Sequence, residues 1–293
     1  MPQILTSNKI ALDNSPEKFG ALRESTELAA DAAALRRRMA EDGYLFIRGG
    51  LDRDVVLAAR REILEKLDAV GELDKTKPLL EAISSGTSNR AAVDQEAFLK
   101  SLRTGEAVRE LCHRGNLKRF YENYLGCEVR PLDYIWVRTV PVGGYTGIHY
   151  DWVYMGRGTK NLHTTWIPVG DVPRNNGALL ILENSHLQEG LQQSYGKLDV
   201  DRDRDKNSYG GAVGGWYSED PVAVQKELGG RWLTADFRAG DMLVFTMFTL
   251  HCSLDNSSPE NRLRITIDTR YQPASEPVDE RWVGDNPLAH GKK

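Results

Sequence analysis

The chain has 293 residues and a formal net charge of −4 at pH 7, from 38 lysines and arginines against 42 aspartates and glutamates. Its composition, 40% apolar and 27% charged, is that of a globular protein, and a chain of this length buries a large core without disulfides or a structural metal. The slightly acidic balance without lysine and arginine blocks argues against a nucleic-acid-binding protein, and the longest aliphatic run, Ala178–Leu182, is far too short to span a bilayer.

The cysteines and the first residues favour a reducing compartment. Cys112, Cys127 and Cys252 are an odd number and form no CxxC pair, so neither a disulfide framework nor a zinc knuckle is predicted. Residues 1–20 have no basic stretch followed by an apolar run, which a secretory signal requires. We therefore expect a cytoplasmic protein with no membrane and no nucleic-acid partner. The sequence gives no indication of oligomeric state.

The N-terminal part is predicted to be a largely helical buttress over residues 1–127. Apolar residues recur at three- and four-residue steps from Leu28 to Met39, and Gly43 follows as a stop signal. Asp52 or Asp54 can cap the next helix. In chain order, we expect a helix at 28–39, a strand at 44–47, a helix at 52–67, a loop at 71–90 and a helix at 94–124.

From Glu128 onward, β-branched and aromatic runs separated by Pro, Gly and Asn turns predict strands. The expected strands are 134–140, 162–169, 178–182, 231–236, 241–247 and 262–271. Along the last strand, Leu263, Ile265 and Ile267 alternate with polar residues, so its polar face should be wet or line a site. We expect a single domain with a β core at 128–273 and a tail at 274–293.

The segment 187–230 has no clear period. Long irregular segments in compact domains are often lids or binding loops. A solvated insertion is the alternative, and the sequence leaves both open. Trp216 lies in this segment and is a candidate to close over a substrate.

Three side chains form a pattern that suits a metal ion. His149 and Asp151 are two residues apart, so on a strand both point to the same face. His251 lies 100 residues beyond Asp151, at the end of the apolar stretch 242–250. Two imidazoles and one carboxylate can occupy one face of an octahedral ion and leave three positions for a chelating cosubstrate and dioxygen, as in non-haem iron(II) oxygenases. Catalytic zinc uses the same ligand types and stays an alternative.

An oxygenase that uses a keto acid also needs a cation for the distal carboxylate of that acid. Arg262 follows His251 by eleven residues, at the start of the predicted strand 262–271, where an antiparallel turn would bring it back towards the metal. A guanidinium suits this role because its planar fork donates two parallel hydrogen bonds to a carboxylate. Arg264 shares the strand face and Arg270 lies farther along, so the periodicity does not choose among the three.

Several short segments occur in a characteristic order. They are His149-x-Asp151, Thr165–Pro168 followed by Asn176–Leu179 and Asn184–His186, Ala239–Asp241 before a strand, and His251-x-Ser253-x-x-Asn256-x-Ser258 leading to Arg262. In this order they resemble the phytanoyl-CoA dioxygenase superfamily of iron(II)/2-oxoglutarate-dependent oxygenases, over roughly residues 134–271. The resemblance implies a mainly β fold with flanking helices, a double-stranded β-helix of the jelly-roll or cupin-like type.

The same resemblance implies roles for particular residues. His149, Asp151 and His251 would be the catalytic iron ligands, and Arg262 would bind the distal carboxylate of 2-oxoglutarate. Ser253 and Trp166 would line the cosubstrate pocket. The cofactors implied are Fe(II), 2-oxoglutarate as cosubstrate and O2.

The implied reaction oxidises a small organic molecule, with release of succinate and CO2. Hydroxylation is the expected outcome, with desaturation and cyclisation as variants, and a natural-product intermediate is the expected substrate type. The candidate substrate-contacting residues are Arg138, Tyr150, Trp152, Met247, Phe248 and Trp216, of which Arg138 could receive an acidic group. Two other functions stay open: a non-catalytic metal- or ligand-binding β-barrel, and a zinc hydrolase with the same triad.

Overall fold

The computed structural model describes residues 4–203 and 214–290. Its larger sheet has the order β4-β10-β7-β12-β5, and β6 also pairs with β12. The bounds are β4 Tyr44–Ile47, β5 Val129–Pro131, β6 Trp136–Val140, β7 His163–Pro168, β10 Met242–Thr246 and β12 Arg264–Pro273. All pairs in this sheet are antiparallel.

The smaller sheet has the order β11-β8-β9-β3. Its strands are β3 Phe19–Ala21, β8 Leu179–Leu182, β9 Trp232–Thr234 and β11 His251–Ser253. Only the β3–β9 pair among these described strands is parallel. A short hairpin of β1 Thr6–Ser7 and β2 Ile10–Ala11 lies outside both sheets. Two facing, mainly antiparallel sheets of this kind confirm the predicted jelly-roll class.

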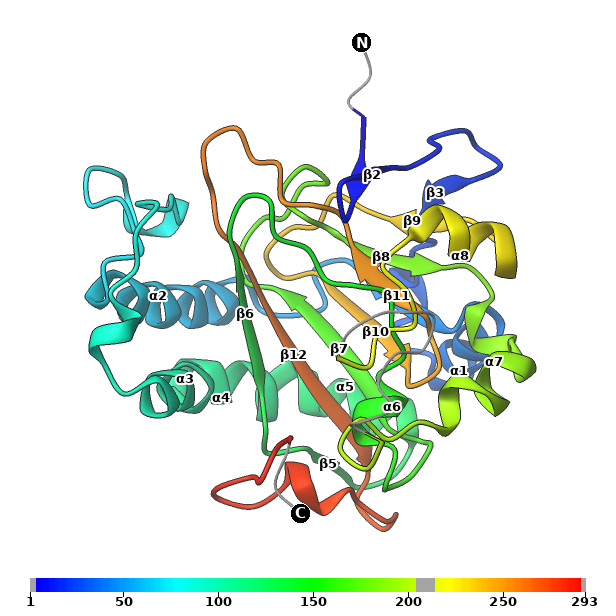
Figure 1. Cartoon of the computed structure of the whole chain (residues 1–293). Coiled ribbons are helices and arrows are strands. Elements are labelled where there is room, and N and C mark those ends of the chain that lie inside the picture. The colour runs from blue at the N-terminus through cyan, green and yellow to red at the C-terminus, as the bar shows by residue number, and fades with distance from the viewer. Residues whose placement is uncertain (1–3, 204–213, 291–293) are drawn as a thin grey trace.

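Within the described chain, five α-helices lie between β3 and β5, with β4 between the first and the second; Figure 1 shows their arrangement. They are α1 Ala32–Asp42, α2 Arg53–Ala69, α3 Gln95–Thr104, α4 Glu106–His113 and α5 Gly115–Leu125. The predicted helices at 28–39 and 52–67 are therefore found with shifted ends. The Asp52 side chain accepts hydrogen bonds from the first turn of α2, and Gly43 ends α1 with φ of +76°.

The single helix predicted at 94–124 is instead three helices. The first break is at Gly105, where a Cβ atom would come within 2.0 Å of the Glu62 carboxylate. That carboxylate accepts hydrogen bonds from the backbone N–H groups of Ala107 and Val108, so α2 caps the N-terminus of α4. The cap is a long-range contact, which the local helical pattern does not contain.

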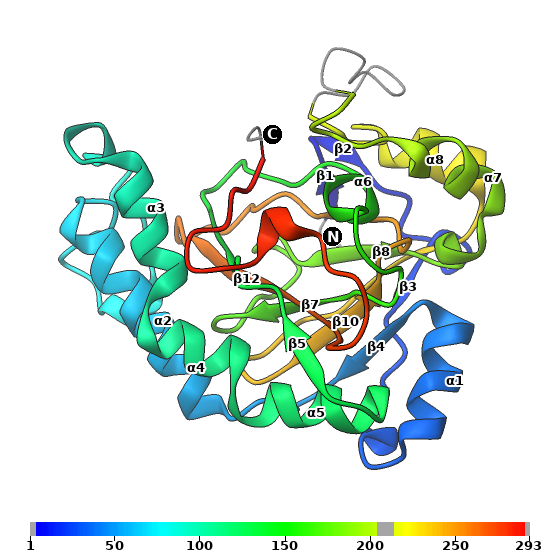
Figure 2. The same cartoon turned by 90° about the horizontal axis from the view of Figure 1, so that it is seen from below.

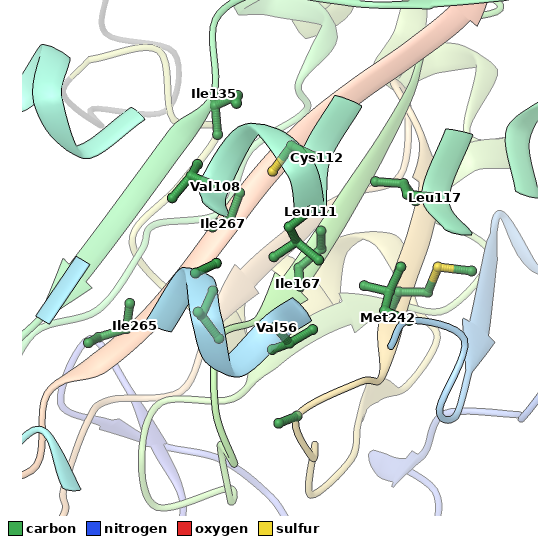
Figure 3. Close-up of a cluster of buried hydrophobic side chains, with 14 of the residues drawn as sticks. Val56, Val108, Leu111, Cys112, Leu117, Ile135, Ile167, Met242, Ile265 and Ile267 are labelled. Atoms are coloured by element: carbon green, nitrogen blue, oxygen red, sulfur yellow. The ribbon is translucent and has the colours of Figure 1, made fainter. Parts of the chain in front are cut away.

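The helices cover one face of the larger sheet (Figure 2). Figure 3 shows the apolar layer between them, in which Val56 of α2 and Leu111 of α4 pack against Ile167, Ile265 and Ile267 of the sheet. The opposite face of the sheet packs against the smaller sheet through a second apolar core. Both faces of the larger sheet are therefore buried.

The polar face of β12 points into the space between the two sheets. Ile265 and Ile267 face the helices, and the alternation turns Arg264, Asp268 and Arg270 towards the interior. All ten residues of β12 are buried. The predicted polar row is therefore buried inside the β-helix and faces the candidate site.

The apolar stretch 242–250 is not one strand. β10 ends at Thr246, and a turn closed by the hydrogen bond from the Thr249 N–H to the Thr246 carbonyl (3.1 Å) carries the chain into the other sheet. His251 is thus the first residue of β11 rather than the last of β10. The segment 187–230 contains α7 Glu189–Gln193 and α8 Pro221–Leu228, with residues 204–213 outside the described part.

Within the described residues, no helix is long and apolar enough to cross a membrane. After β12 the chain does not leave the body as a tail. Trp282 is fully buried, and its carbonyl accepts a hydrogen bond from the Tyr134 N–H. The C-terminal segment 274–290 therefore packs against the β core, beside β5 in Figure 2.

Candidate metal centre and its pocket

His149, Asp151 and His251 converge at one buried point. One ligand atom from each lies within 4.8 Å of the others. Asp151 Oδ1 is 3.6 Å from His149 Nε2 and 3.9 Å from His251 Nε2. The two histidines are joined by a pair of backbone hydrogen bonds of 3.0 and 3.1 Å, a local bridge between segments far apart in sequence.

Asp151 reaches this point from a turn and not from a strand. The strand-like pairing ends at His149, and Asp151 has helical backbone angles (φ −65°, ψ −27°) as the residue before the short helix α6, Trp152–Met155. The prediction that His149 and Asp151 share one face of a strand is therefore wrong, although their side chains do meet. Their side chains meet because the chain turns there.

Both imidazoles have a fixed orientation. His149 Nδ1 lies 2.8 Å from the Gly147 carbonyl oxygen, and His251 Nδ1 lies 3.0 Å from that of Thr249. A carbonyl only accepts, so Nδ1 of each ring is the protonated nitrogen and Nε2 keeps its lone pair for an ion. Burial, reinforced by the neighbouring His149, lowers the pKa of His251 to about 3, so this ring is neutral at physiological pH.

The other carboxylate oxygen of Asp151 is held by the protein. Asp151 Oδ2 accepts hydrogen bonds from the Thr164 hydroxyl and from Arg270 Nη2, the latter at 2.9 Å. Burial alone would raise the pKa of Asp151, but the Arg270 guanidinium outweighs it and holds the pKa well below its usual value. Two imidazole nitrogens and one ionised carboxylate thus fit a first-row divalent ion such as iron(II), and also zinc.

The inward row of β12 carries polar atoms that lack partners. Arg264 Nε, Thr266 Oγ1 and Arg270 Nη1 are buried and have no hydrogen-bond partner among the described residues. Buried donors of this kind are rare unless a ligand or water satisfies them. The row leads from Arg264, beside Thr146, to Arg270, beside Asp151. Its chemistry fits an elongated anion with a carboxylate at each end.

Arg264 is a buried cation without a carboxylate. Its Nη1 donates to the Gly177 carbonyl at 2.5 Å, and within the described chain no aspartate or glutamate forms an ion pair with it. Burial, assisted by the nearby Arg138, lowers its pKa to about 10, so it stays charged at neutral pH. An unpaired buried charge is costly, and an anionic ligand would compensate it.

Arg262 is placed elsewhere. It precedes β12, its backbone bridges to Ile83, and its carbonyl accepts hydrogen bonds from the amides of Asn176 and Asn256. Neither its side chain nor that of Arg264 lines the pocket beside the triad, but only Arg264 lies within β12 and turns towards the interior. The structure thus brings Arg264, and not the predicted Arg262, into the polar row.

The two predicted cosubstrate contacts lie in the walls of the β-helix. The Ser253 hydroxyl accepts a hydrogen bond from the Thr146 N–H at 2.9 Å, at the same end of the row as Arg264. Trp166 is buried on the inward face of β7, with its ring 4.7 Å from that of Phe237. Neither side chain lines the pocket described next.

A pocket of about 320 Å³ opens beside the triad. It is lined by His149, Asp151, Trp136, Arg138, Tyr145, Thr146, Tyr154, Met155, Gly214, Trp216, Arg270 and His290. Arg138 and Trp216 were predicted as substrate contacts and do line it. Trp136 was missed, although it shares an alternating strand face with Arg138; Arg270 lies over its ring, with Cζ 3.9 Å from the ring centroid.

The other four predicted substrate contacts do not face this pocket. Tyr150 is buried in the core between the two sheets, where its hydroxyl donates to the Ser185 carbonyl. Met247 is fully buried, and the rings of Trp152 and Phe248 pack on each other at 5.1 Å. These side chains belong to the core behind the ligands.

The C-terminal segment supplies part of the pocket wall. His290 lines the pocket and lies 3.3 Å from the Asp201 carboxylate. Arg281 is buried and pairs with Asp201 and Asp279, and it also donates to the Tyr154 carbonyl at 3.0 Å. This ionic cluster ties the C-terminal segment to α6 and to the segment 187–230. No motif in the sequence marks His290 as a pocket residue.

Comparisons with known proteins show the family and the fold of this chain. The chain matches the family described as phytanoyl-CoA dioxygenase over residues 39–264. It is 28% identical to a 1-deoxypentalenic acid 11-beta-hydroxylase of Streptomyces exfoliatus over 260 residues, covering 86% of this chain and 85% of the relative. The same name and identity hold for a Streptomyces arenae protein over 267 residues, at 88% and 87% coverage.

Solved structures share the fold at lower identity. The non-heme alpha ketoglutarate dependent carbocyclase SnoK from nogalamycin biosynthesis has a TM-score of 0.57 at 18% identity, covering 93% of this chain and 97% of that one. The apoform of EctD from S. alaskensis has a TM-score of 0.54 at 16% identity, with 99% and 94% coverage. The epimerase SnoN, solved with Fe3+, alpha ketoglutarate and nogalamycin RO, has a TM-score of 0.51 at 20% identity, with 89% and 95% coverage.

Proposed function

This chain belongs to the phytanoyl-CoA dioxygenase family and is an iron(II)/2-oxoglutarate-dependent oxygenase, and from that premise we propose that it hydroxylates a small organic substrate of the natural-product type. Succinate and CO2 are the coproducts. The two relatives at 28% identity, which cover most of both chains, are named as hydroxylases. A pocket of about 320 Å³ is of the size that holds a small molecule.

The observation that carries the proposal is the triad together with the unpartnered polar row of β12. In the proposal, His149, Asp151 and His251 hold iron(II), and the distal carboxylate of 2-oxoglutarate binds Arg264 in place of the expected Arg262. The buried Arg264 charge without a carboxylate partner supports this assignment. Ser253 and Thr146 lie at the same end of the row and are placed to orient that carboxylate.

Other residues prepare the centre. Iron(II) with bound 2-oxoglutarate supplies the chemistry that activates O2 and oxidises the substrate. Arg270 and Thr164 bind Oδ2 of Asp151 and keep this carboxylate ionised. Its other oxygen, Oδ1, therefore faces the two imidazoles and can bind the metal. Trp136, placed against Arg270, and the aromatic walls of the pocket keep water away from the reacting C–H bond.

Anaerobic titration with iron(II) and 2-oxoglutarate tests the proposal. We expect a visible charge-transfer band that the Asp151→Ala variant does not form, because that variant lacks the carboxylate ligand. Asp236→Ala, which changes an exposed aspartate that pairs with Arg174, is the matched control and should keep the band. A wild-type protein without the band, or one that binds zinc and hydrolyses substrates without oxygen, would contradict the proposal.

Product mass distinguishes the reaction types. With oxygen and a suitable substrate, hydroxylation adds one oxygen atom for each succinate released. Desaturation or cyclisation removes two hydrogen atoms instead and would replace hydroxylation as the assigned reaction.

A further inference from the structure

Arg138 presents a cationic side chain to the pocket beside the triad. It lies on β6, and its Nε donates to Asp268 Oδ2 at 2.7 Å. No hydrogen bond from its two terminal nitrogens is found among the described residues. The Arg138 side chain is 34% exposed, whereas that of Asp268 is only 6% exposed. Asp268 therefore anchors the Arg138 guanidinium through Nε, and the two terminal nitrogens of Arg138 are available to a ligand in the pocket.

The charges of the site do not balance when iron and cosubstrate are bound. Arg138 is paired with Asp268, Arg270 is paired with Asp151, and Arg264 has no carboxylate partner among the described residues. Iron(II) adds two positive charges, and 2-oxoglutarate adds two negative ones. One positive charge is left over in a buried site, where an uncompensated charge is unfavourable.

The remaining polar groups on the wall do not supply the missing negative charge. His290, a further basic side chain of the pocket, lies 3.3 Å from the Asp201 carboxylate. Trp136, Tyr145 and Trp216 give the wall large aromatic surfaces, with the last two rings 5.9 Å apart. The pocket thus combines aromatic surfaces with two arginines, of which Arg270 holds Asp151 and Arg138 is anchored by Asp268.

We propose that the substrate is an apolar carboxylic acid whose single carboxylate binds the terminal nitrogens of Arg138. The inference rests on the proposed function. The carboxylate would neutralise the charge left over in the occupied site, and the aromatic walls would hold the carbon skeleton against the metal centre. The hydrogen bond from Arg138 to Asp268 holds the guanidinium in one position. That position would determine which carbon of the bound substrate lies at the metal centre.

A pair of probes of equal shape tests this inference. Adamantane-1-carboxylate and the neutral adamantane-1-carboxamide are titrated into anaerobic protein loaded with iron(II) and 2-oxoglutarate, with binding followed by calorimetry and by tryptophan fluorescence. Trp136 and Trp216 lie in the pocket wall and should report occupancy. We expect the carboxylate to bind about tenfold to a hundredfold more tightly than the carboxamide, the effect of hydrogen bonds to a charged group.

Variants separate Arg138 from general effects. Arg138→Gln should remove the preference for the carboxylate, and Arg138→Lys should keep part of it. Arg174→Gln, which changes a partly exposed arginine outside the pocket, should keep all of it. Because Arg138→Gln leaves Asp268 without its cation, the double variant Arg138→Gln/Asp268→Asn serves as a second test with a neutral pair. It should fold and show no preference.

The outcomes distinguish this inference from the function on which it rests. Equal binding of the two probes, or no binding of the carboxylate, overturns the inference while the charge-transfer band upholds the oxygenase. An Arg138→Gln protein that loses affinity for 2-oxoglutarate and keeps its preference for the carboxylate probe also overturns it, because Arg138 would then serve the cosubstrate. A wild-type protein without the band contradicts the proposed function itself.

Discussion

Substitution of Arg264 by glutamine tests which arginine holds the cosubstrate. Arg264 is buried, faces the interior of the β-helix and lacks a carboxylate, whereas Arg262 lies before the strand and its backbone bridges to Ile83. We expect Arg264→Gln to lose most of its affinity for 2-oxoglutarate. Arg262→Gln is the matched control, two residues away in sequence, and should bind the cosubstrate as the wild type does.

The size of the effect follows from the contacts of Arg264. Hydrogen bonds between charged partners contribute roughly 1.5–3 kcal/mol, so the Kd for 2-oxoglutarate should rise about 10- to 150-fold. The variant also loses the hydrogen bond to the Gly177 carbonyl, which is worth about 1 kcal/mol. Removal of the unpaired buried cation offsets that loss, because burying such a charge lowers the stability of the apoprotein by roughly several kcal/mol. The Tm without ligand should therefore not fall.

Two measurements follow these expectations. Anaerobic titration of the iron-loaded proteins gives the Kd from the charge-transfer band, and thermal unfolding with and without 2-oxoglutarate gives the ligand-induced rise in Tm. Arg264→Gln should lose that rise. A normal Kd for Arg264→Gln together with a weakened Arg262→Gln would refute the assignment of Arg264.

Three further predictions concern the surroundings of the site. Asp151→Asn should abolish succinate release. It should also lower the free energy of unfolding by about 3 kcal/mol, because the buried Arg270 charge loses its carboxylate partner. An unchanged free energy of unfolding in urea would contradict this. Burial lowers the pKa of His163 to about 4, below the value of about 6.5 in the unfolded chain. Between these two pH values the unfolded apoprotein binds one more proton than the folded one. The free energy of unfolding should therefore fall by on the order of 3 kcal/mol as the pH drops from about 6.5 to 4. His163→Gln should flatten this part of the urea-measured pH profile, and an unchanged slope would count against it. Arg281→Gln should break the ion pair with Asp201, raise the KM for substrate and speed proteolysis of the C-terminal segment, with the charge-transfer band preserved; loss of the band would show a wider role.

Local patterns in the sequence were enough for much of the fold. The apolar steps before Gly43, the strand alternation of Ile265 and Ile267, and the change of pattern near Glu128 all correspond to elements of the structure. Each of these signals lies within a dozen residues, where the period of side-chain directions is set by the backbone itself. The family resemblance rested on such short segments in order, and the match over residues 39–264 confirms it.

The sequence by itself thus determined the β-helix class, the family and a set of metal-binding residue types. Only the tertiary structure decided that Arg264 rather than Arg262 enters the polar row, and that His290 from the supposed tail lines the pocket. The reason is physical: residue spacing fixes which way a side chain points within one element, whereas the position at which β12 begins and the course of the C-terminal segment are set by long-range contacts. Those contacts include the bridge to Ile83 and the ion pairs of Arg281, and no local pattern carries them.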